Sequence, residues 1–388
     1  MQIHKAYRIR IYPSSEQEKH FLDTINACRF VYNYYLDMRL SAYSDGGRQI
    51  PHAELSRDLT KLRKSTEWLR DIQISPLQQS LRTLDVAYSK FYRKESHFPR
   101  FRSRRDTRQS FRKPDAWSLN GNRLRIERNL SVRFRGTPPP PTAKLGTLTI
   151  SRSTTGKWYA SITCTEFLEQ NAAPSATSIG IDLGLRALAT TSDGVKYANP
   201  AVHKKQLKHL KLLQQSLARK DRDSYRYKKA KLEVARMHEK IANRRMNHLH
   251  QVSSAITRKN HALIAVEDLA VANMMKNRRL SRSIGDVAWG EFLRQLEYKQ
   301  SWSGGRFVKI DRFFPSSKTC SQCNFIVDRL PLNIRAWDCP RCEAHHDRDI
   351  NAAKNILKQA EVQLGVESTD GSPLAGESYR LDEARSVV

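Results

Sequence analysis

The sequence predicts a multidomain fold that combines α+β and α/β parts, and three observations support that prediction. Short segments of alternating apolar residues before residue 170 indicate an antiparallel β-barrel, which amphipathic helical segments interrupt. Apolar strands that end in carboxylates after residue 178 indicate a second domain with a buried sheet. Four cysteines in two pairs, shortly before a C-terminal helix, indicate a metal-binding insertion.

Composition indicates the kind of partner. The 388 residues include 68 Lys and Arg against 39 Asp and Glu, a net charge of +29, and the hydrophobic content of 39% is enough for packed cores. A folded chain that is basic along nearly its whole length is expected to bind nucleic acid. A membrane surface is the weaker alternative, since no apolar run approaches the ~20 residues of a spanning helix and the polar N-terminus does not resemble a signal peptide. The two cysteines outside the pairs, Cys28 and Cys164, are interpreted as buried thiols in a reducing cytosol, without disulfides.

The first half of the chain is expected to be a barrel with a helical insertion. A strand over Ala6–Tyr12 leads to Pro13, after which Ser14 or Ser15 caps a helix. Residues 14–95 form a helical unit, whose helices are expected at Phe21 to about Leu40, at about His52 to Leu69, and from the cap-and-proline pair Ser75-Pro76 onward. Residues 1–13 and 96–170 form the barrel, with later strands at Arg123–Ile126, Val132–Phe134, Thr147–Ile150 and Trp158–Cys164.

The second half follows a linker at Gln170–Ser178. Residues 175–317 and 346–360 are assigned to the second domain, and residues 318–345 to the metal-binding insertion. The expected elements are a strand ending at Asp182 with a hairpin after it, two antiparallel basic helices over about His203–Lys259, a strand ending at Glu267, a helix around Trp289–Ser301 and a strand at Phe307–Ile310. Residues 361–388 hold six acids and two arginines, a net charge of −4, and are expected to be a disordered acidic tail.

Three acids in this second half have the order and context of a nuclease site. Asp182 and Glu267 each end an apolar strand, and Asp349 directly precedes an apolar helix. In a ribonuclease-H-like fold the first acid ends a central strand, the second ends another strand, and the third caps a nearby helix. Carboxylates are ligands that Mg²⁺ prefers, and two Mg²⁺ ions ~4 Å apart stabilise both the attacking and the leaving oxygen in phosphodiester cleavage. Asp347 is the alternative third ligand, and each acid alone fits a turn or an N-cap.

Small residues around two of these acids allow close approach. Gly180 and Gly184 flank Asp182, and Ala352-Ala353 follow Asp349. We expect the helix that carries Asp349 to pack tightly on the sheet at these positions.

The cysteine pairs predict a structural zinc site. Cys320, Cys323, Cys339 and Cys342 form a CxxC pair, a gap of fifteen residues and a second CxxC pair. Four thiolates at this spacing make a tetrahedral Zn²⁺ site with no open position, and metal binding supplies folding energy to the segment. A redox CxxC pair is the alternative, and His345 or His346 could replace one thiolate.

Two basic segments are candidates for contact with nucleic acid. In Phe98-Pro99-Arg100-Phe101-Arg102, Phe98 and Phe101 could stack on bases while Arg100 and Arg102 bind phosphate. The alternative is a strand with its phenylalanines in the core, and both hold if the phenylalanines are buried and the arginines contact RNA. Arg244 and Arg245, in the basic helical region, are weaker candidates, because charge runs are usually solvated.

Six segments, spread from Ala6 to about Leu357, match one known family. They are Cys28-Arg29-Phe30-Val31-Tyr32-Asn33, Phe98-Pro99-Arg100-Phe101-Arg102, Gly180-Ile181-Asp182-Leu183-Gly184, Glu267-Asp268-Leu269, Phe314-Pro315-Ser316-Ser317-Lys318-Thr319-Cys320 and Asp347-Arg348-Asp349-Ile350-Asn351-Ala352-Ala353-Lys354-Asn355-Ile356. Each is modest alone, and together they are specific. The chain resembles the TnpB family of transposon-encoded RNA-guided nucleases, regarded as ancestral to the type V CRISPR effectors.

The resemblance implies a wedge β-barrel interrupted by a helical recognition domain, followed by a RuvC-type nuclease domain with a zinc-containing, target nucleic-acid-binding insertion. It implies an ωRNA guide that pairs with double-stranded target DNA, while the protein reads a short flanking motif. Gln78 matches a family position that contacts this motif. It also implies a monomer with one RNA, in the prokaryotic cytoplasm and at the nucleoid when bound to DNA.

The sequence therefore predicts a Mg²⁺-dependent, RNA-guided DNA endonuclease with a single RuvC site. One alternative is a ribonuclease-H-like transposase, which uses the same acids for strand transfer and needs no RNA. The others are an RNA-guided repressor, which is disfavoured because all three acids are kept, and a non-catalytic nucleic-acid-binding regulator.

Overall fold

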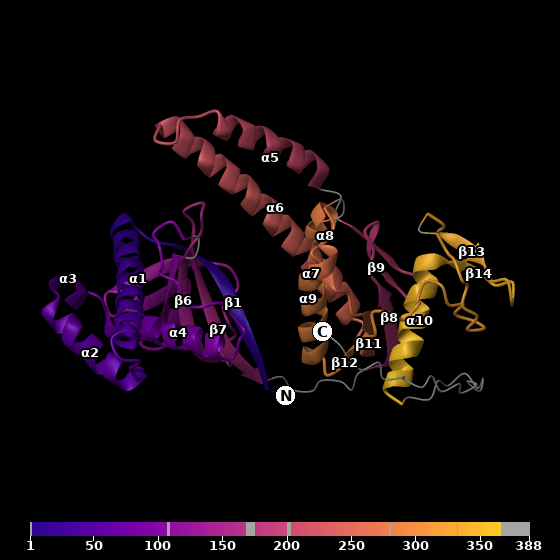
Figure 1. Cartoon of the computed structure of the whole chain (residues 1–388), viewed down its shortest axis with the longest axis horizontal. Coiled ribbons are helices and arrows are strands. Elements are labelled where there is room, and N and C mark those ends of the chain that lie inside the picture. Colours follow the sequence, from indigo (N-terminus) through magenta and orange to yellow (C-terminus); the bar gives the residue numbers. More distant parts are fainter. Residues whose placement is uncertain are drawn as a thin grey trace. The chain divides into compact units, whose positions relative to one another are not determined.

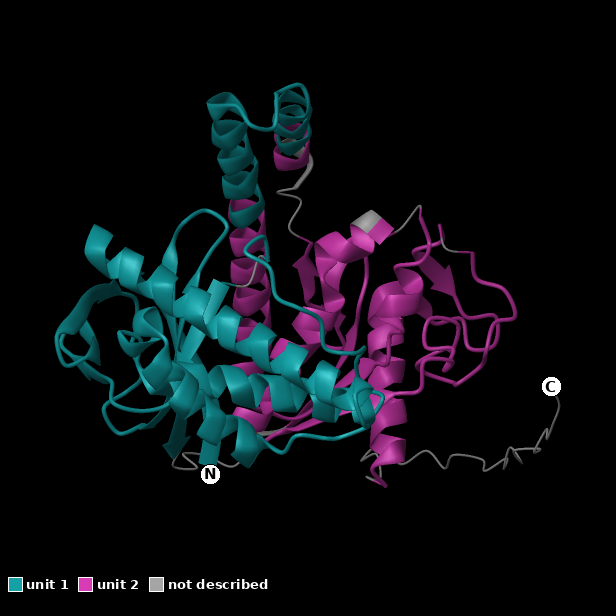
Figure 2. Cartoon of the chain, turned by 60° about the vertical axis from the view of Figure 1, so that its left-hand side comes forward, with its two compact units in different colours: residues 1–171, 210–239 teal, residues 172–209, 240–388 magenta. Residues whose placement is uncertain are grey.

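The computed structural model describes residues 2–106, 109–167, 175–199, 203–278, 281–331 and 333–365 (Figure 1). The chain divides into two compact units, one of residues 1–171 with 210–239 and one of residues 172–209 with 240–388 (Figure 2). Within the described ranges, no helix is both long and apolar enough to span a membrane. Most of the expected acidic tail, residues 366–388, lies outside the described residues, and residues 361–363 end the last helix.

The first unit is built on a curled antiparallel sheet of seven strands in the order β2-β6-β7-β1-β5-β4-β3. Its strands are β1 (Gln2–Tyr12), β2 (Gln109–Lys113), β3 (Ser118–Asn120), β4 (Arg123–Glu127), β5 (Leu130–Arg135), β6 (Lys144–Arg152) and β7 (Trp158–Phe167). The first strand pairs with β5 and β7 across the helical segment, as expected from the sequence. Among the described strands the hydrogen bonds leave β2 and β3 as edges, so the pairing does not close into the expected barrel.

Four helices of this unit share one core with the sheet: α1 (Ser15–Ser44), α2 (His52–Ser65), α3 (Glu67–Arg70) and α4 (Ile74–Tyr92). Ser14 caps α1, because its hydroxyl accepts from the Gln17 amide while the Gln17 side chain accepts from the Ser14 amide. The expected cap at Ser75 is wrong: the N-cap of α4 is Gln73, two residues earlier, and the Ser75 hydroxyl donates to Asp115 at 2.7 Å. The helix expected to end at Leu69 is interrupted at Thr66.

The second unit is built on a mixed sheet of five strands in the order β10-β9-β8-β11-β12. Its strands are β8 (Ser175–Asp182), β9 (Ala187–Thr191), β10 (Lys196–Ala198), β11 (His261–Glu267) and β12 (Arg306–Ile310). β8 is antiparallel to β9 and parallel to β11, which is parallel to β12. β8 begins at Ser175, so the expected linker is shorter than predicted.

The helices after β10 are α5 (His203–Ala218), α6 (Tyr225–Thr257), α7 (Val271–Met274), α8 (Ser281–Val287), α9 (Trp289–Trp302) and α10 (Arg348–Gln363). The expected pair of basic helices is present as α5 and α6, and the boundary between the two units falls within both of them. Between β12 and α10 lies the cysteine-containing insertion, whose small sheet pairs β13 (Ala336–Asp338) with β14 (His345–Asp347). α10 packs against β8, β11 and β12 (Figure 1).

Candidate active site and metal centre

The first two predicted acids lie side by side at one edge of the second sheet. β8 and β11 are parallel, and their register pairs Gly180 with Ala265 and Ile181 with Val266. The next position of each strand is Asp182 and Glu267, so both carboxylates leave the sheet at the same end. The three strand residues directly before each acid are buried, and both acids are partly buried.

The third acid reaches this edge because α10 packs unusually close to β8. A Cβ atom at Gly180 would lie 2.0 Å from the carbonyl oxygen of Ala353 and 2.9 Å from the backbone nitrogen of Leu357. Only glycine allows this approach, which agrees with the expectation from the small residues. Asp349, in the first turn of α10, is thereby brought within electrostatic reach of Asp182.

Burial and the neighbouring carboxylates dominate the electrostatics of Asp182 and Glu267. Burial raises the pKa of Asp182 to about 7, and the charges of Asp349 and Glu267 add to the increase. Burial also raises the pKa of Glu267, with a further contribution from Asp268. Three carboxylates held together in this way are chemically suited to divalent cations, which relieve their repulsion and take oxygen ligands.

Asp347 and Asp349 have different roles in the structure. Asp347 is the N-cap of α10, and its Oδ1 accepts hydrogen bonds from the backbone amides of Asp349 and Ile350 at 3.1 Å. Its other oxygen is 2.6 Å from Nζ of Lys196, and this ion pair helps to lower the pKa of Asp347 although burial alone raises it. Asp349 has a longer contact, 3.4 Å to Arg335, which leaves it the more available of the two for a cation.

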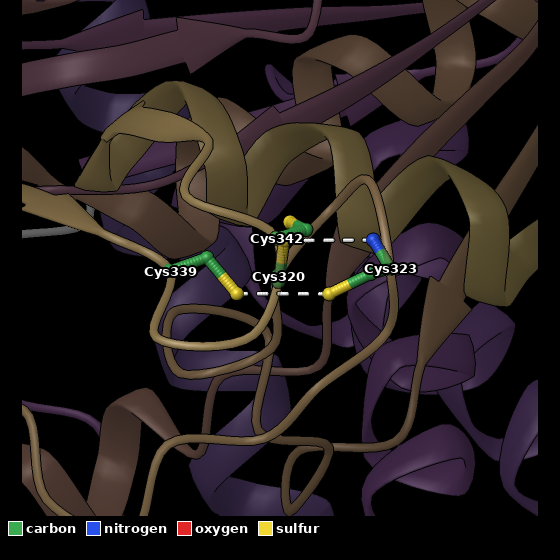
Figure 3. Close-up of side chains that lie close together, drawn as sticks. All are labelled: Cys320, Cys323, Cys339 and Cys342. Carbon is green, nitrogen blue, oxygen red and sulfur yellow. Dashed lines mark hydrogen bonds between the residues drawn. The ribbon is translucent and has the colours of Figure 1, made fainter.

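The four predicted cysteines come together in the insertion (Figure 3). Their sulfur atoms all lie within 4.8 Å of one another, with Cys320 and Cys342 at 3.6 Å and Cys323 and Cys339 at 3.6 Å. A tetrahedral Zn²⁺ ion with Zn–S distances of ~2.3 Å requires sulfur atoms ~3.8 Å apart, so the cluster fits zinc.

His346 lies next to the cluster without displacing a thiolate. Its Nε2 is 3.1 Å from Sγ of Cys320, and its ring packs on Trp337 with the centroids 4.9 Å apart. A ring N–H that donates to a ligand sulfur orients that ligand and stabilises its negative charge. His345 is exposed and pairs with Asp338 at 2.6 Å.

The predicted nucleic-acid segment Phe98–Arg102 is a loop in the first unit, and its phenylalanines are exposed, unlike in the alternative of a strand with buried phenylalanines. Phe98 is 43% exposed and Phe101 is 53% exposed. The loop is held by Asn33, whose side chain donates to the carbonyl of Arg102 at 2.9 Å and accepts from its amide at 2.8 Å. These backbone bonds replace a strand ladder, which is why the alternating pattern does not form a strand here.

A cavity of about 830 Å³ borders this loop, and its lining includes Gln79, Phe98, Arg100, Phe101 and Arg102. The guanidinium of Arg102 lies 3.7 Å from the ring centre of Tyr32. Gln78 is partly buried on α4, and the lining of this cavity takes its neighbour Gln79 instead.

The two arginines predicted on the basic helix differ in availability. Arg244 is exposed on α6. Arg245 is paired with Asp286 at 3.0 Å, so its charge is partly neutralised within the second unit.

Sequence reasoning missed two residues that shape these sites, and it considered a third, His346, only as a replacement for a thiolate. Arg335 reaches Asp349, His346 contacts Cys320 as a neighbour of the cluster, and Asn33 anchors the aromatic loop. Asn33 and His346 lie inside or beside segments that the family resemblance singles out, which is the signal that could have identified them. Arg335 lies in an irregular stretch of the insertion and has no such signal.

Three family models match the chain: "Helix-turn-helix domain" at residues 1–48, "Probable transposase" at residues 161–278 and "Cas12f1-like, TNB domain" at residues 289–356. Residues 2–44 of the first match hold β1 and α1, a strand and a single long helix.

Full-length relatives are also similar. A Streptomyces pristinaespiralis protein named as a candidate RNA-guided DNA endonuclease is 38% identical over 363 residues, covering 92% of this chain and 89% of that protein. InsQ of Escherichia coli K12, named in the same way, is 33% identical over 401 residues, covering 98% of each chain. The solved structure of Cas12f1 with its guide RNA and target DNA is 13% identical, covers 92% of this chain and 98% of its own, and aligns with a TM-score of 0.58, which shows a shared fold.

Proposed function

The chain belongs to the TnpB family, and from that premise we propose that it is a transposon-associated, RNA-guided DNA endonuclease that cuts both strands of a target with one site. The observation that carries the proposal is the convergence of Asp182, Glu267 and Asp349 from three separate segments, with a raised pKa at the most buried acid. The names of the relatives and the net charge of +29 support RNA and DNA as the polyanionic partners.

The elements within each unit support a finer assignment. We assign the curled sheet to the wedge domain, residues 14–95 to the recognition domain, residues 175–317 and 346–360 to a RuvC-like, ribonuclease-H-like nuclease domain, and residues 318–345 to the zinc-containing insertion. The support for the nuclease domain is that its acids end two neighbouring parallel strands and start a helix packed on them.

The three acids would hold the reaction's cations. Two Mg²⁺ ions bound there would supply an activated water molecule and stabilise the charge on the leaving oxygen. Asp182 must lose its proton to take part, which its pKa of about 7 permits near neutral pH. Asp347 keeps the first turn of α10 in place by capping it, and Arg335 restrains the carboxylate of Asp349.

The cysteine cluster would hold a structural Zn²⁺ ion. Cys320, Cys323, Cys339 and Cys342 fill all four positions of a tetrahedron, so no position is left for water or substrate. The redox alternative is disfavoured, because four sulfur atoms share one centre.

An ωRNA and a double-stranded DNA target are the proposed partners, in a complex of one chain with one RNA in the prokaryotic cytoplasm. The exposed Phe98 and Phe101, with Arg100 and Arg102 beside them, form a surface that can stack on bases and bind phosphate. Gln78 remains a proposed reader of the flanking motif, and Arg244 a proposed phosphate contact.

A transposase is the second candidate, because the model that matches residues 161–278 carries that description. Purifying the chain from cells that hold its native flanking DNA, and sequencing any bound RNA, separates the two. A discrete RNA that extends from the transposon end supports the guided nuclease. Chain without RNA that binds transposon-end DNA would support the transposase instead.

A further inference from the structure

α10, which carries Asp349, contacts the sheet on one side and the zinc-binding loop on another. Ala353, Ile356 and Ala360 are buried on the side that faces the sheet. Asn351, Asn355 and Lys358 recur at helical spacing on another side and contact residues 316–321, which include Cys320. The helix is therefore held between the sheet and the zinc-binding loop.

Asn351 binds the main chain on both sides of a zinc ligand. Its Nδ2 donates to the carbonyl of Thr319 at 2.7 Å, and its Oδ1 accepts from the amide of Ser321 at 2.9 Å. Cys320, between these two residues, is fully buried, and Asn351 is 2% exposed. The position of this thiolate is thus fixed by a side chain of α10.

Asn355 and Lys358 extend the same contact by one and two turns. The Nδ2 of Asn355 donates to the carbonyls of Thr319 at 2.6 Å and Ser316 at 2.8 Å, and Nζ of Lys358 donates to the carbonyl of Ser321. The carbonyls are backbone groups of an irregular loop, which has no sheet or helix of its own to satisfy them. If the loop loses its order, the buried amides of α10 lose their partners.

The first turn of α10 is held by the same insertion. Arg348 donates from Nη1 to the carbonyl of Pro331 at 2.7 Å, and its backbone amide donates to the carbonyl of Arg335. Asp349 lies between Arg348 and Asn351, so residues on both sides of the third carboxylate are bound to the zinc-binding segment.

We propose that Asn351 and Asn355 are positioning residues that couple zinc binding to the placement of Asp349, so that zinc raises the divalent-cation affinity of the three-carboxylate site. The inference rests on the proposed function for the nature of that site. Zinc orders the loop, the loop holds the two amides, and the amides fix the first turns of the helix. Because coupling between two binding sites is reciprocal in free energy, a cation at the carboxylates also raises the affinity for zinc by the same factor.

The test compares zinc-loaded and zinc-stripped full-length chain, using Mn²⁺ as the probe of the carboxylate site. Electron paramagnetic resonance counts free Mn²⁺, and binding that disappears in Asp182→Asn defines the site. Removing zinc is expected to weaken Mn²⁺ binding at least ~10-fold, the lower end of what outer-shell contacts contribute to metal affinity. Equal Mn²⁺ affinity with and without zinc would overturn the proposal.

Variants locate the coupling. Asn351→Leu and Asn355→Leu keep the branched shape of the side chain but lose the amide, and both are expected to release zinc faster to a chelator and to bind Mn²⁺ ~10-fold more weakly. Gln363→Leu, at the exposed end of α10, is the matched control and is expected to change neither. Faster zinc release with unchanged Mn²⁺ affinity would contradict the proposal, and the wild-type comparison stands even if a variant fails to fold. Zinc-loaded wild type without Asp182-dependent Mn²⁺ binding would instead refute the cation site of the proposed function.

Discussion

Gly180→Ala tests whether the close packing of α10 on β8 builds the proposed active site. The added Cβ would lie 2.0 Å from the carbonyl oxygen of Ala353 and 2.9 Å from both N and Cβ of Leu357. Two of these three atoms belong to the helix backbone, so no change of rotamer removes the clash. Since real Cβ contacts essentially never fall below 3.0 Å, the helix has to move by about 1 Å.

Two effects of different size follow from this shift. Overpacking of a tight contact destabilises a fold by ~1–3 kcal/mol, so the chain should still fold. A displacement of ~1 Å at catalytic groups costs ~100-fold in rate, and Asp349 moves with α10. Cutting should therefore fall far more than stability does.

Single-turnover cutting of a matched target, together with urea unfolding, measures both effects. Gly290→Ala is the control, because Gly290 lies on a helix of the same unit with nothing within 4 Å of a new Cβ. It should cut normally and gain ~0.5–1 kcal/mol, as expected for glycine replaced in a helix. Wild-type cutting by Gly180→Ala would refute the claim that this contact positions the third acid.

Three further predictions concern charge. Without divalent cations the pKa of Asp182 is about 7 in the folded chain, against an ordinary value of 3.8, so this group makes stability fall as pH rises between those two values. Asp182→Asn should therefore raise the free energy of unfolding at pH 8 in urea titrations. A less stable variant at that pH would contradict the burial argument. Asp347→Ala should cost ~1 kcal/mol as a lost cap but slow cutting much less than Asp349→Ala, and the reverse order in kinetic assays would make Asp347 the ligand. RNA affinity should fall steeply with salt because bound phosphates release counterions, and a flat dependence in filter binding would argue against the +29 charge as the source of affinity.

The parts of the site that depend on chain periodicity could be predicted from the sequence. Asp182 and Glu267 follow apolar strands, and parallel pairing of those strands brings the acids to one edge. The cysteine spacing is likewise local, and the four sulfur atoms lie within 4.8 Å. The choice of Asp349 over Asp347 as the free carboxylate stays a prediction, supported by the capping role of Asp347.

The features that depend on side-chain contacts between distant segments could not be predicted from the sequence. Phe98 and Phe101 have an alternating pattern, but Asn33 from α1 holds their loop outside any sheet and leaves them exposed. The short edge strands β2 and β3 have too few residues for a pattern that predicts a strand. The sequence does not predict the start of α4, because Ser75, a favoured cap residue, bonds to the distant Asp115 instead.

The measurement that tests the central claim most directly is guide-directed cutting. The chain is purified with its RNA, and Mg²⁺-dependent cutting is measured on double-stranded DNA that matches the guide beside a randomised flank, with Asp182→Ala as the control. We predict cuts that follow the guide sequence, require one flanking motif and disappear in Asp182→Ala while RNA binding persists. Cutting that ignores the guide, or that survives in Asp182→Ala, would contradict an RNA-guided nuclease built on these three acids.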